Sequence, residues 1–268
     1  MPTILITGTS SGIGRATARH FASKGWNVAA TMRNPNDARD LAGDMLVLPL
    51  DVTVRESIDK AVADAVDVFG SLDVVVNNAG YAAIGALEAI SADQIKQQFA
   101  VNVFGTMGVT QAVLPLFRRQ GGGVIVNISS IVGRFTYPLG TVYDASKFAI
   151  EGFSEALRFE LEAIGARIKI VEPGLIASDF GTRSMQFAHD PALRAYQPLV
   201  DAMRSMAAKF AEMAEPAEVV AEAVWCAATD GTETLRYPAG SAAHNALADR
   251  DTLDDLTFYA KTKDRFGL

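Results

Sequence analysis

A strand, a glycine-rich turn and a helix follow one another directly at the start of the chain. The apolar residues 3–7 are expected to form the strand, and the helical pattern of residues 15–24 ends at Gly25. Glycine lets a backbone approach a pyrophosphate closely, and the N–H groups and dipole at a helix start attract its negative charge. A tight turn without a ligand has a similar pattern, but the flanking strand and helix favour a nucleotide site. The turn is Thr7-Gly8-Thr9-Ser10-Ser11-Gly12-Ile13-Gly14.

Strands and helices alternate through the first half of the chain. Short apolar runs at residues 27–32, 45–49 and 72–76 are expected to be strands, and residues 54–69 an amphipathic helix that ends at Gly70. Apolar strands separated by helices predict an α/β fold, a Rossmann-type doubly wound parallel sheet with helices on both faces. With 268 residues and 49% hydrophobic content, we expect a single domain over the whole chain.

Polar residues follow two of the predicted strands. Asp51 comes directly after the third strand, and the segment Asn77-Asn78-Ala79-Gly80 comes after the fourth. Ligands of parallel α/β sheets bind at the carboxyl ends of the strands. Both segments are therefore candidates for the ligand site.

The end of the second strand distinguishes NAD from NADP in dinucleotide folds. A site for NAD usually places a carboxylate there, whereas this chain has Arg33 and no acid before Asp37. A guanidinium pairs well with the 2′-phosphate that only NADP carries, so the sequence favours NADP over NAD. The alternative is that Arg33 is a solvated loop charge and that Asp37 turns towards the ribose.

A second stretch, near the middle of the chain, has the composition of an active site. Residues 124–128 are a short β-branched run, expected to be a buried strand, and Ser129 and Ser130 follow it. The next predicted helix carries Tyr143 and Lys147, four residues apart and therefore on one face. A nearby ammonium stabilises phenolate and would lower the tyrosine pKa from about 10, which suits a general acid or base. Taken alone, the pair also fits an exposed helix contact.

The composition argues against nucleic acids and membranes as partners. The net charge is −7, no block of lysines and arginines occurs, and no uninterrupted apolar run is long enough to cross a bilayer. The first residues lead straight into a strand without the basic segment of a signal peptide. The single cysteine, Cys226, fits a reducing compartment, and His189 and His244 lack the spacing of metal ligands. We therefore expect a cytoplasmic protein without a metal site.

Seven motifs, in their order along the chain, resemble those of the short-chain dehydrogenase/reductase family, in its compact single-domain branch. The resemblance covers nearly the whole chain and implies hydride transfer between a nicotinamide and a carbonyl or alcohol. The motifs are Thr7-Gly8-x-x-x-Gly12-Ile13-Gly14, Asp51-Val52-Thr53, Asn77-Asn78-Ala79-Gly80, Phe99-Ala100-Val101-Asn102, Ser130, Tyr143-x-x-x-Lys147 and Pro173-Gly174.

The resemblance implies four catalytic residues. Tyr143 corresponds to the family's proton donor or acceptor, and Lys147 to the lysine that holds the nicotinamide ribose and lowers the pKa of that tyrosine. Ser130 corresponds to the serine that orients the substrate oxygen, whereas Ser129 should point to the other face of the strand. Asn102 corresponds to the asparagine whose water links Lys147 to solvent; a locally satisfied helix amide is the alternative.

The resemblance also implies the cofactor contacts. Asp51 would contact the adenine, and the nicotinamide carboxamide would lie against the turn at Pro173. Ser178 stands where the family usually has a threonine, and no basic residue lies within the glycine turn, so the NADP preference depends mainly on Arg33. The expected contacts are Gly8, Ser10, Ser11, Gly12, Ile13, Gly14, Arg33, Asp51, Val52, Asn78, Ala79, Gly80, Tyr143, Lys147, Pro173, Gly174, Ile176 and Ser178.

The second half of the chain is expected to supply the substrate side. Residues 167–171 predict a strand, residues 217–228 a helix and residues 235–238 a last strand, while residues 175–214 show no clear strand pattern and suggest a lid or mobile loop. Methionine and phenylalanine in this segment suit an apolar substrate such as a steroid, a retinoid or an aromatic ketone, although ordinary helix packing explains several of them equally well. The stretch from Asp249 would dock on a partner subunit or over the cleft. The apolar residues concerned are Phe180, Met185, Phe187, Met203, Met206, Phe210 and Met213.

We therefore predict an NADP-dependent oxidoreductase for a hydrophobic carbonyl or alcohol, with Tyr143 as the general acid or base. The alternatives are a regulator that senses NADP without catalysis, and an isomerase or epimerase that retains its nucleotide. A sensor would not need Tyr143 and Lys147, and an isomerase would need a larger substrate portion. The resemblance also implies a homodimer or homotetramer, formed through the helices that hold Asn102 and Tyr143.

Overall fold

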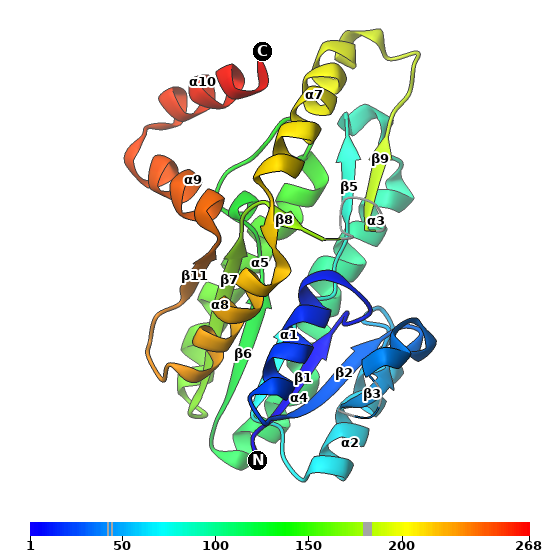
Figure 1. Cartoon of the computed structure of the whole chain (residues 1–268), viewed down its shortest axis with the longest axis vertical. Helices are drawn as coiled ribbons and strands as arrows, with labels where there is room; N and C mark the ends of the chain where they lie inside the picture. The colour runs from blue at the N-terminus through cyan, green and yellow to red at the C-terminus, as the bar shows by residue number, and fades with distance from the viewer. Residues whose placement is uncertain (42, 44, 179–183) are drawn as a thin grey trace.

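Seven parallel strands form the central sheet (Figure 1). The structure, a computed structural model, describes residues 1–41, 43, 45–178 and 184–268. The strand order is β11-β7-β6-β4-β1-β2-β3, with parallel pairing throughout, which confirms the predicted doubly wound sheet. The strands are β1 (Thr3–Thr7), β2 (Asn27–Met32), β3 (Leu46–Pro49), β4 (Val74–Asn77), β6 (Gly123–Ile128), β7 (Ala166–Pro173) and β11 (Arg236–Ala239).

Helices cover both faces of this sheet. On one face, Ile4 and Ile6 of β1 share a buried cluster with Phe21 of α1, and on the other face Leu5 clusters with Val113 of α4. Successive residues of a strand point to opposite faces, so one apolar strand supplies both cores. The helices are α1 (Gly12–Ser23), α2 (Arg55–Phe69), α3 (Ala92–Phe99), α4 (Thr106–Gln120), α5 (Thr141–Glu162), α7 (Gln197–Met213), α8 (Ala217–Thr229), α9 (Ser241–Thr252) and α10 (Asp255–Phe266).

A widened turn interrupts the long helical run formed by α3 and α4. Ser91 caps the start of α3, and the π-helix η3 (Ala100–Gly105) joins α3 to α4. The widened turn carries Asn102. The sequence predicted a helix at this place, but nothing in its pattern indicated the extra residue of a π-turn, which often occurs at functional sites.

The same run, Ala92–Gln120, is long and apolar enough to cross a membrane by length and composition, with a mean hydropathy of 1.4. Buried helices of soluble proteins have the same properties. Val109, Val113 and Phe117 of this run are fully buried against the central sheet. Its apolar face is therefore used within the fold, and the expectation of no membrane partner stays a prediction.

Residues 175–214 contain more regular structure than their sequence suggested. Strand β9 (Met185–Ala188) pairs in parallel with β5 (Ala82–Gly85), and the helix α7 follows. The expectation of a segment without regular structure is wrong for these residues, because a four-residue strand is too short to show alternation. Of the four residues that helix packing was expected to explain, Met206 is buried on α7, Met203 and Phe210 are partly buried and Met213 is exposed, while Phe180 lies outside the described residues.

The C-terminal helices pack beside α7 and the loop that precedes α5. In Figure 1, α10 lies at the same end of the molecule as α7, and the two helices are in contact. The ring of Phe258 is 5.1 Å from that of Phe135, and the ring of Phe266 is 5.4 Å from that of Tyr137 and 5.9 Å from that of Phe210. These contacts anchor α10 on the loop before α5 and on α7, and docking of this segment on a partner subunit or over the cleft stays a prediction.

Candidate active site

Three segments that are distant in the sequence meet at the carboxyl ends of β1, β4 and β6. Strand β1 has β2 on one side and β4 on the other, so the chain connections diverge at this point of the sheet. Sheets of this type bind ligands where the strand order reverses. The glycine turn follows β1, Asn78 follows β4, and the two serines follow β6.

The glycine turn packs directly against the segment after β4. A Cβ atom at Gly8, where φ is +74°, would lie 2.9 Å from Ala79 Cα, and one at Gly14 would lie 2.4 Å from the carbonyl oxygen of Gly8. Asn78 Nδ2 donates to the carbonyl oxygens of Thr7 (2.8 Å) and Gly8 (3.1 Å). Only glycine fits at these two positions, and the resulting cradle at the start of α1 fits the pyrophosphate of a dinucleotide.

The remaining residues of the turn leave this cradle open. Ser10, Ser11, Gly12 and Ile13 are all partly exposed, and Ser11 is the extended residue that precedes α1. Ser178 approaches them from the far side, because a Cβ atom at Gly12 would lie 3.3 Å from Ser178 Cβ. The structure therefore brings the expected carboxamide contact and the phosphate turn together.

The turn after β7 lies beside the same crevice. Gly174 N donates to the carbonyl oxygen of Ala239 (3.0 Å), and a Cβ atom at Gly174 would lie 2.7 Å from Ala243 N at the start of α9. Pro173 ends β7, and Ile176 pairs with Glu215 in the short strands β8 (Ile176–Ala177) and β10 (Glu215–Pro216). This turn is thus fixed by the C-terminal third of the chain.

Asp51 and Val52 lie past β3, on the adenine side of the expected site. Asp51 Oδ1 accepts from the backbone N–H (2.9 Å) and the hydroxyl (2.7 Å) of Thr53. Val52 packs on the π-helix, where a Cβ atom at Gly105 would lie 2.7 Å from its Cγ2. These contacts hold the segment in place and leave Asp51 partly exposed.

Two arginines lie at the loop after β2: Arg33 within it, as the sequence indicated, and Arg15 of α1 against it. Arg33 is exposed at the end of β2, and Asp37 Oδ1 accepts from Asn34 Nδ2 (3.0 Å). Arg15 was not predicted: its Nη2 donates to the carbonyl oxygen of Asp37 (3.2 Å) and lies 3.5 Å from Asp40 Oδ1. The sequence could have indicated Arg15 as a cofactor contact, because it lies in the first turn of α1 directly after the glycines.

Helix α5 places Tyr143 and Lys147 on one face, as predicted. Lys147 Nζ lies 5.7 Å from the centroid of the Tyr143 ring and donates to the carbonyl oxygen of Ile128 (2.9 Å). Ser130 hydrogen-bonds the phenol of Tyr143, and its Oγ also accepts from Val132 N (3.3 Å). The three expected reacting groups therefore form one contiguous set.

Burial dominates the electrostatics of this set. The pKa of Tyr143 is raised above its usual value, first by burial and then by Asp144, while the hydrogen bond from Ser130 lowers it. Burial also lowers the pKa of Lys147 to about 8, against the opposing effect of Glu151. The expectation that Lys147 lowers the pKa of Tyr143 is therefore wrong for this structure, because desolvation raises that pKa and disfavours the charged forms of both groups.

Asn102 is tied to the same helix through hydrogen bonds within the protein. Its Oδ1 accepts from Tyr81 N (3.1 Å), and its Nδ2 donates to the carbonyl oxygen of Tyr81 (3.0 Å) and to Ser146 Oγ (3.2 Å). Gly80 lies against it, since a Cβ atom there would be 3.2 Å from Asn102 Oδ1. The π-turn thus places Asn102 between β4 and α5, and its role in a water relay stays a prediction.

Asp144 is a buried carboxylate that the sequence did not reveal. It is 2% exposed, its Oδ2 accepts from Tyr137 N (3.1 Å), and its own N–H donates to the carbonyl oxygen of Gly140 (2.8 Å). Burial raises its pKa to about 7. An acid in the first turn of a helix is expected to face solvent and the helix dipole, so the pattern gave no signal of its burial.

Apolar side chains surround one side of Tyr143. Its ring packs with a cluster from the loop before α5 and from α9, which contains Phe135 and Ala243. A neighbouring cluster joins Leu139 of the same loop to Val200 of α7. Within the described part of the chain no His, Cys, Asp and Glu residues are grouped to hold a metal, and His189 Nε2 lies 3.3 Å from Gln197 Oε1.

Known proteins resemble this chain over most of its length. A family model described as short chain dehydrogenase matches residues 2–188. The chain belongs to the short-chain dehydrogenase family. It is accordingly an NAD(P)-dependent oxidoreductase.

Relatives of this short-chain dehydrogenase occur in fungi and bacteria. An uncharacterized oxidoreductase of Schizosaccharomyces pombe is 40% identical and covers 88% of this chain and 100% of its own. The 3-ketodihydrosphingosine reductase of Bacteroides thetaiotaomicron is 40% identical over 67% of this chain and 64% of its own. The crystal structure of a short-chain dehydrogenase from Streptomyces avermitilis is 31% identical, with a TM-score of 0.85 over 99% of this chain and 97% of that one.

Replacing Asp144 by asparagine should flatten the pH dependence of stability of this short-chain dehydrogenase. The carboxyl has a pKa of about 7 in the folded protein and about 4 in an unfolded chain. The folded state therefore holds an extra proton between these values, and the free energy of unfolding falls as the pH rises from about 4 to about 7. Asp144→Asn removes this loss, which is on the order of 2 to 4 kcal/mol.

Urea unfolding at pH 5 and pH 8 measures the effect. The loss between the two pH values should be smaller in Asp144→Asn than in the wild type. It should not vanish, because burial also raises the pKa of Glu172 to about 7. Asp93→Asn, at a side chain that is 94% exposed, is the control and should match the wild type. An equal loss in Asp144→Asn and the wild type would contradict the buried state of Asp144.

Proposed function

We propose that this protein is an NADP-dependent oxidoreductase that interconverts a carbonyl and a secondary alcohol on a hydrophobic substrate, with Tyr143 as the general acid or base. The observation that supports this most strongly is the contiguous set of Ser130, Tyr143 and Lys147 beside the glycine cradle. A proton donor next to a dinucleotide site is what reduction of a carbonyl requires.

Each group of the set has a role that follows from its position. The nicotinamide, when bound, supplies the hydride. Ser130 donates a hydrogen bond to the substrate oxygen, and Tyr143, which is neutral because it is buried, delivers the proton to that oxygen. Lys147, whose ammonium lies at the end of β6, holds the ribose hydroxyls of the nucleotide. Asn102 positions the water that returns a proton to Tyr143 after each turnover. In alcohol oxidation the same groups act in the opposite order.

The NADP preference is supported by the charges at the end of β2. Arg33 is exposed where the 2′-phosphate would lie, and the carboxylate of Asp37 is engaged by Asn34 rather than turned to the ribose. Arg15 adds a second guanidinium beside the same loop. Both cations would stabilise a bound, doubly charged 2′-phosphate, whereas they would add little to the binding free energy of a free ribose hydroxyl.

A hydrophobic substrate is supported by the aromatic wall beside Tyr143. Phe135 and Tyr137 of the loop before α5 pack with Phe258 and Phe266 of α10 and with Phe210 of α7. Pockets of this composition bind apolar ligands through buried area. The relative named 3-ketodihydrosphingosine reductase points in the same direction.

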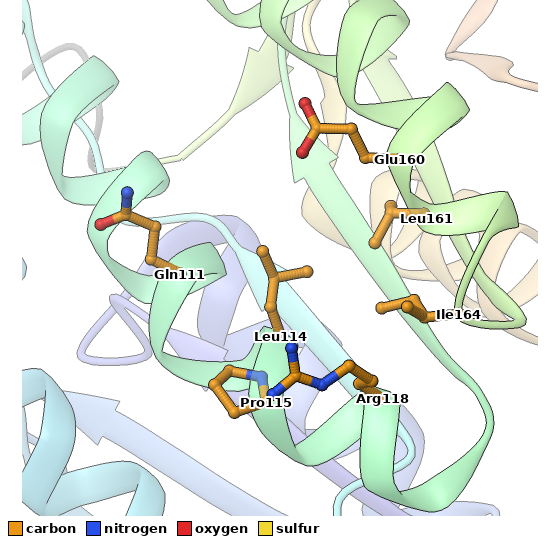
Figure 2. A pocket seen from close by; sticks show the side chains of 7 residues that line it. All are labelled: Gln111, Leu114, Pro115, Arg118, Glu160, Leu161 and Ile164. Carbon is orange, nitrogen blue, oxygen red and sulfur yellow. The ribbon is translucent and has the colours of Figure 1, made fainter.

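A homo-oligomer is supported by the exposed face that α5 shares with the π-helix. Phe104 of the π-helix and Phe148 and Phe159 of α5 are 63%, 44% and 77% exposed, and large apolar side chains left this exposed often mark a contact surface. Figure 2 shows a groove between α4 and the C-terminal part of α5 with the residues that follow it. Its lining residues are Gln111, Leu114, Pro115, Arg118, Glu160, Leu161 and Ile164. We infer that a second copy of the chain covers this face.

Replacing Tyr143 by phenylalanine should abolish turnover and leave NADPH affinity within a few fold. The substitution removes only the hydroxyl, and loss of a general acid costs about 10²- to 10⁴-fold in rate. Lys147→Met should weaken both turnover and NADPH binding. Tyr259→Phe, at a tyrosine of α10 that is 65% exposed, is the matched control and should keep full activity. Turnover that survives in Tyr143→Phe would exclude Tyr143 as the general acid. If the wild type and all variants bind NADPH without turnover, the result would favour a regulator that senses NADP without catalysis.

Replacing Arg33 by alanine should weaken NADPH and leave NADH unchanged. Loss of a hydrogen-bonded charge pair corresponds to about a 10- to 100-fold increase in the NADPH dissociation constant. Fluorescence titration with each nucleotide measures both constants. Arg119→Ala, at an exposed position near the end of α4, is the control. An equal effect on the two nucleotides would mean that Arg33 does not contact the 2′-phosphate.

Replacing Phe159 by glutamate should reduce the molar mass in solution. Light scattering after size exclusion should give a dimer or tetramer for the wild type and a smaller species for the variant, because a buried charge would oppose the contact. Val68→Glu introduces the same charge on α2 at a side chain that is 60% exposed, and it should leave the mass unchanged. A monomeric wild type would refute the oligomer.

A further inference from the structure

One face of α5 carries ionisable groups on three successive turns, at Tyr143, Lys147 and Glu151. The first two belong to the proposed reaction, but Glu151 does not. It is only 5% exposed. Burial of a carboxylate costs several kcal/mol unless it is paired, so the position of Glu151 requires a physical reason.

The end of β6 meets this face residue by residue. Lys147 Nζ donates to the carbonyl oxygen of Ile128. One residue later, the hydroxyl of Ser129 lies close to Glu151 and lowers the pKa of that carboxyl, but the two groups form no hydrogen bond in the described part of the chain. The next residue, Ser130, is the one that contacts the phenol of the reacting tyrosine. Three adjacent residues at the end of the strand therefore face three adjacent turns of α5.

A glycine makes the contact between Ser129 and Glu151 possible. A Cβ atom at Gly133 would lie 2.7 Å from Ser129 Oγ and 3.1 Å from Glu151 Oε1. Both polar atoms thus face the same backbone position, where any side chain would displace one of them. The expectation that Ser129 points to the other face of the strand from Ser130 stays a prediction.

Arg236 fixes the carboxylate of Glu151 from the opposite side, and Arg134 joins the same network through Glu172. Arg236 Nε donates to Glu151 Oε2 (3.0 Å) and lies 3.8 Å from Oε1 of Glu172, which is itself 1% exposed. Arg134 Nη1 lies 3.4 Å from the same oxygen of Glu172, and its Nη2 donates to Asp251 Oδ1 (3.0 Å). The network therefore connects β11, β7, α5, α9 and the loop after β6.

We propose that Glu151 is a positioning residue for the reaction: its buried negative charge, fixed by Arg236, stabilises the ammonium of Lys147 one helical turn away, beside the strand end that presents Ser130. The inference depends on the proposed function only in treating Lys147 as a residue of the reacting site. Glu151 acts through Lys147 and does not itself contact the substrate or the nucleotide.

Burial and the neighbouring charges act on the pKa of Glu151 in opposite directions. Burial raises the pKa of Glu151, whereas Arg236 and Arg134 lower it. Glu172 has a pKa of about 7, so it is largely ionised before Lys147 loses its proton near pH 8. The charged groups that face Glu151 are Lys147 and Glu155 on α5, Arg236 on β11, Glu172 on β7 and Arg134 after β6.

The test is the pH dependence of NADPH binding, followed by fluorescence from pH 6 to pH 10 in the wild type and in Glu151→Gln. Because the ammonium of Lys147 holds the ribose, affinity should fall above about pH 8 in the wild type, and this fall should be absent in Lys147→Met. In Glu151→Gln the fall should begin about one pH unit lower, since an opposite charge has been removed from a buried lysine. Glu151→Asp, which keeps the charge, should restore most of the wild-type profile.

Glu155→Gln is the matched control, because Glu155 pairs with the same Arg236 but its side chain is 56% exposed. In Glu155→Gln, the affinity for NADPH should fall at the same pH as in the wild type. A fall at the same pH in Glu151→Gln and the wild type, or an equal displacement in Glu155→Gln, would overturn the proposal. Should Glu151→Gln not fold, Glu151→Ala, which buries no amide, provides the same measurement. The readout needs no substrate, so a protein that binds NADPH without reducing any carbonyl would refute the proposed function and still test Glu151.

Discussion

Parallel pairing of β4 with β1 on one side and with β6 on the other is the constraint on which the site depends. Val74 pairs with Ile4 and with Val124, so the three strands end at the same level of the sheet. At that level Asn77 Nδ2 donates to Asn127 Oδ1 (2.8 Å), and Asn127 Nδ2 donates to Ser154 Oγ of α5 (2.8 Å). If the pairing of these strands slipped by one residue, the two asparagines would point to the opposite face of the sheet. The strand register and the placement of α5 are therefore fixed together.

Burial then determines the chemistry of the groups that this register brings together. Tyr143 and Lys147 are both pushed towards their neutral forms, and the nearby carboxyls of Asp144 and Glu172 have pKa values of about 7. A neutral phenol beside a hydroxyl suits delivery of a proton to a carbonyl oxygen. A lysine that titrates near pH 8 needs a compensating negative charge to stay an ammonium in this environment, and Glu151 is placed to provide it.

Much of the fold followed from short-range patterns in the sequence. The strands of the first half and the helix that ends at Gly70 lie within about two residues of their predicted bounds, because apolar runs and glycine caps are local signals. Helix α1 begins at Gly12, three residues earlier than predicted, so two of the glycines lie inside its first turn. The short strand β9 and the π-turn at Asn102 left no pattern of that kind.

The site was predictable where residue type and spacing carry the chemistry, as for Ser130, Tyr143 and Lys147. It was not predictable where burial decides. Asp144 and Glu151 are acids on a helix, and such residues are expected to face water until the surrounding chain shows otherwise. The raised pKa of Tyr143 likewise depends on how much apolar surface covers it, which no spacing of residues reveals.

The measurement that tests the central claim most directly is oxidation of NADPH and NADH by the wild-type protein, followed optically with a panel of steroidal, retinoid, aromatic and small aliphatic carbonyls. The site predicts turnover with an apolar carbonyl, faster with NADPH than with NADH. Tight nucleotide binding without turnover on any carbonyl, or on the corresponding alcohols with NADP⁺, would contradict it.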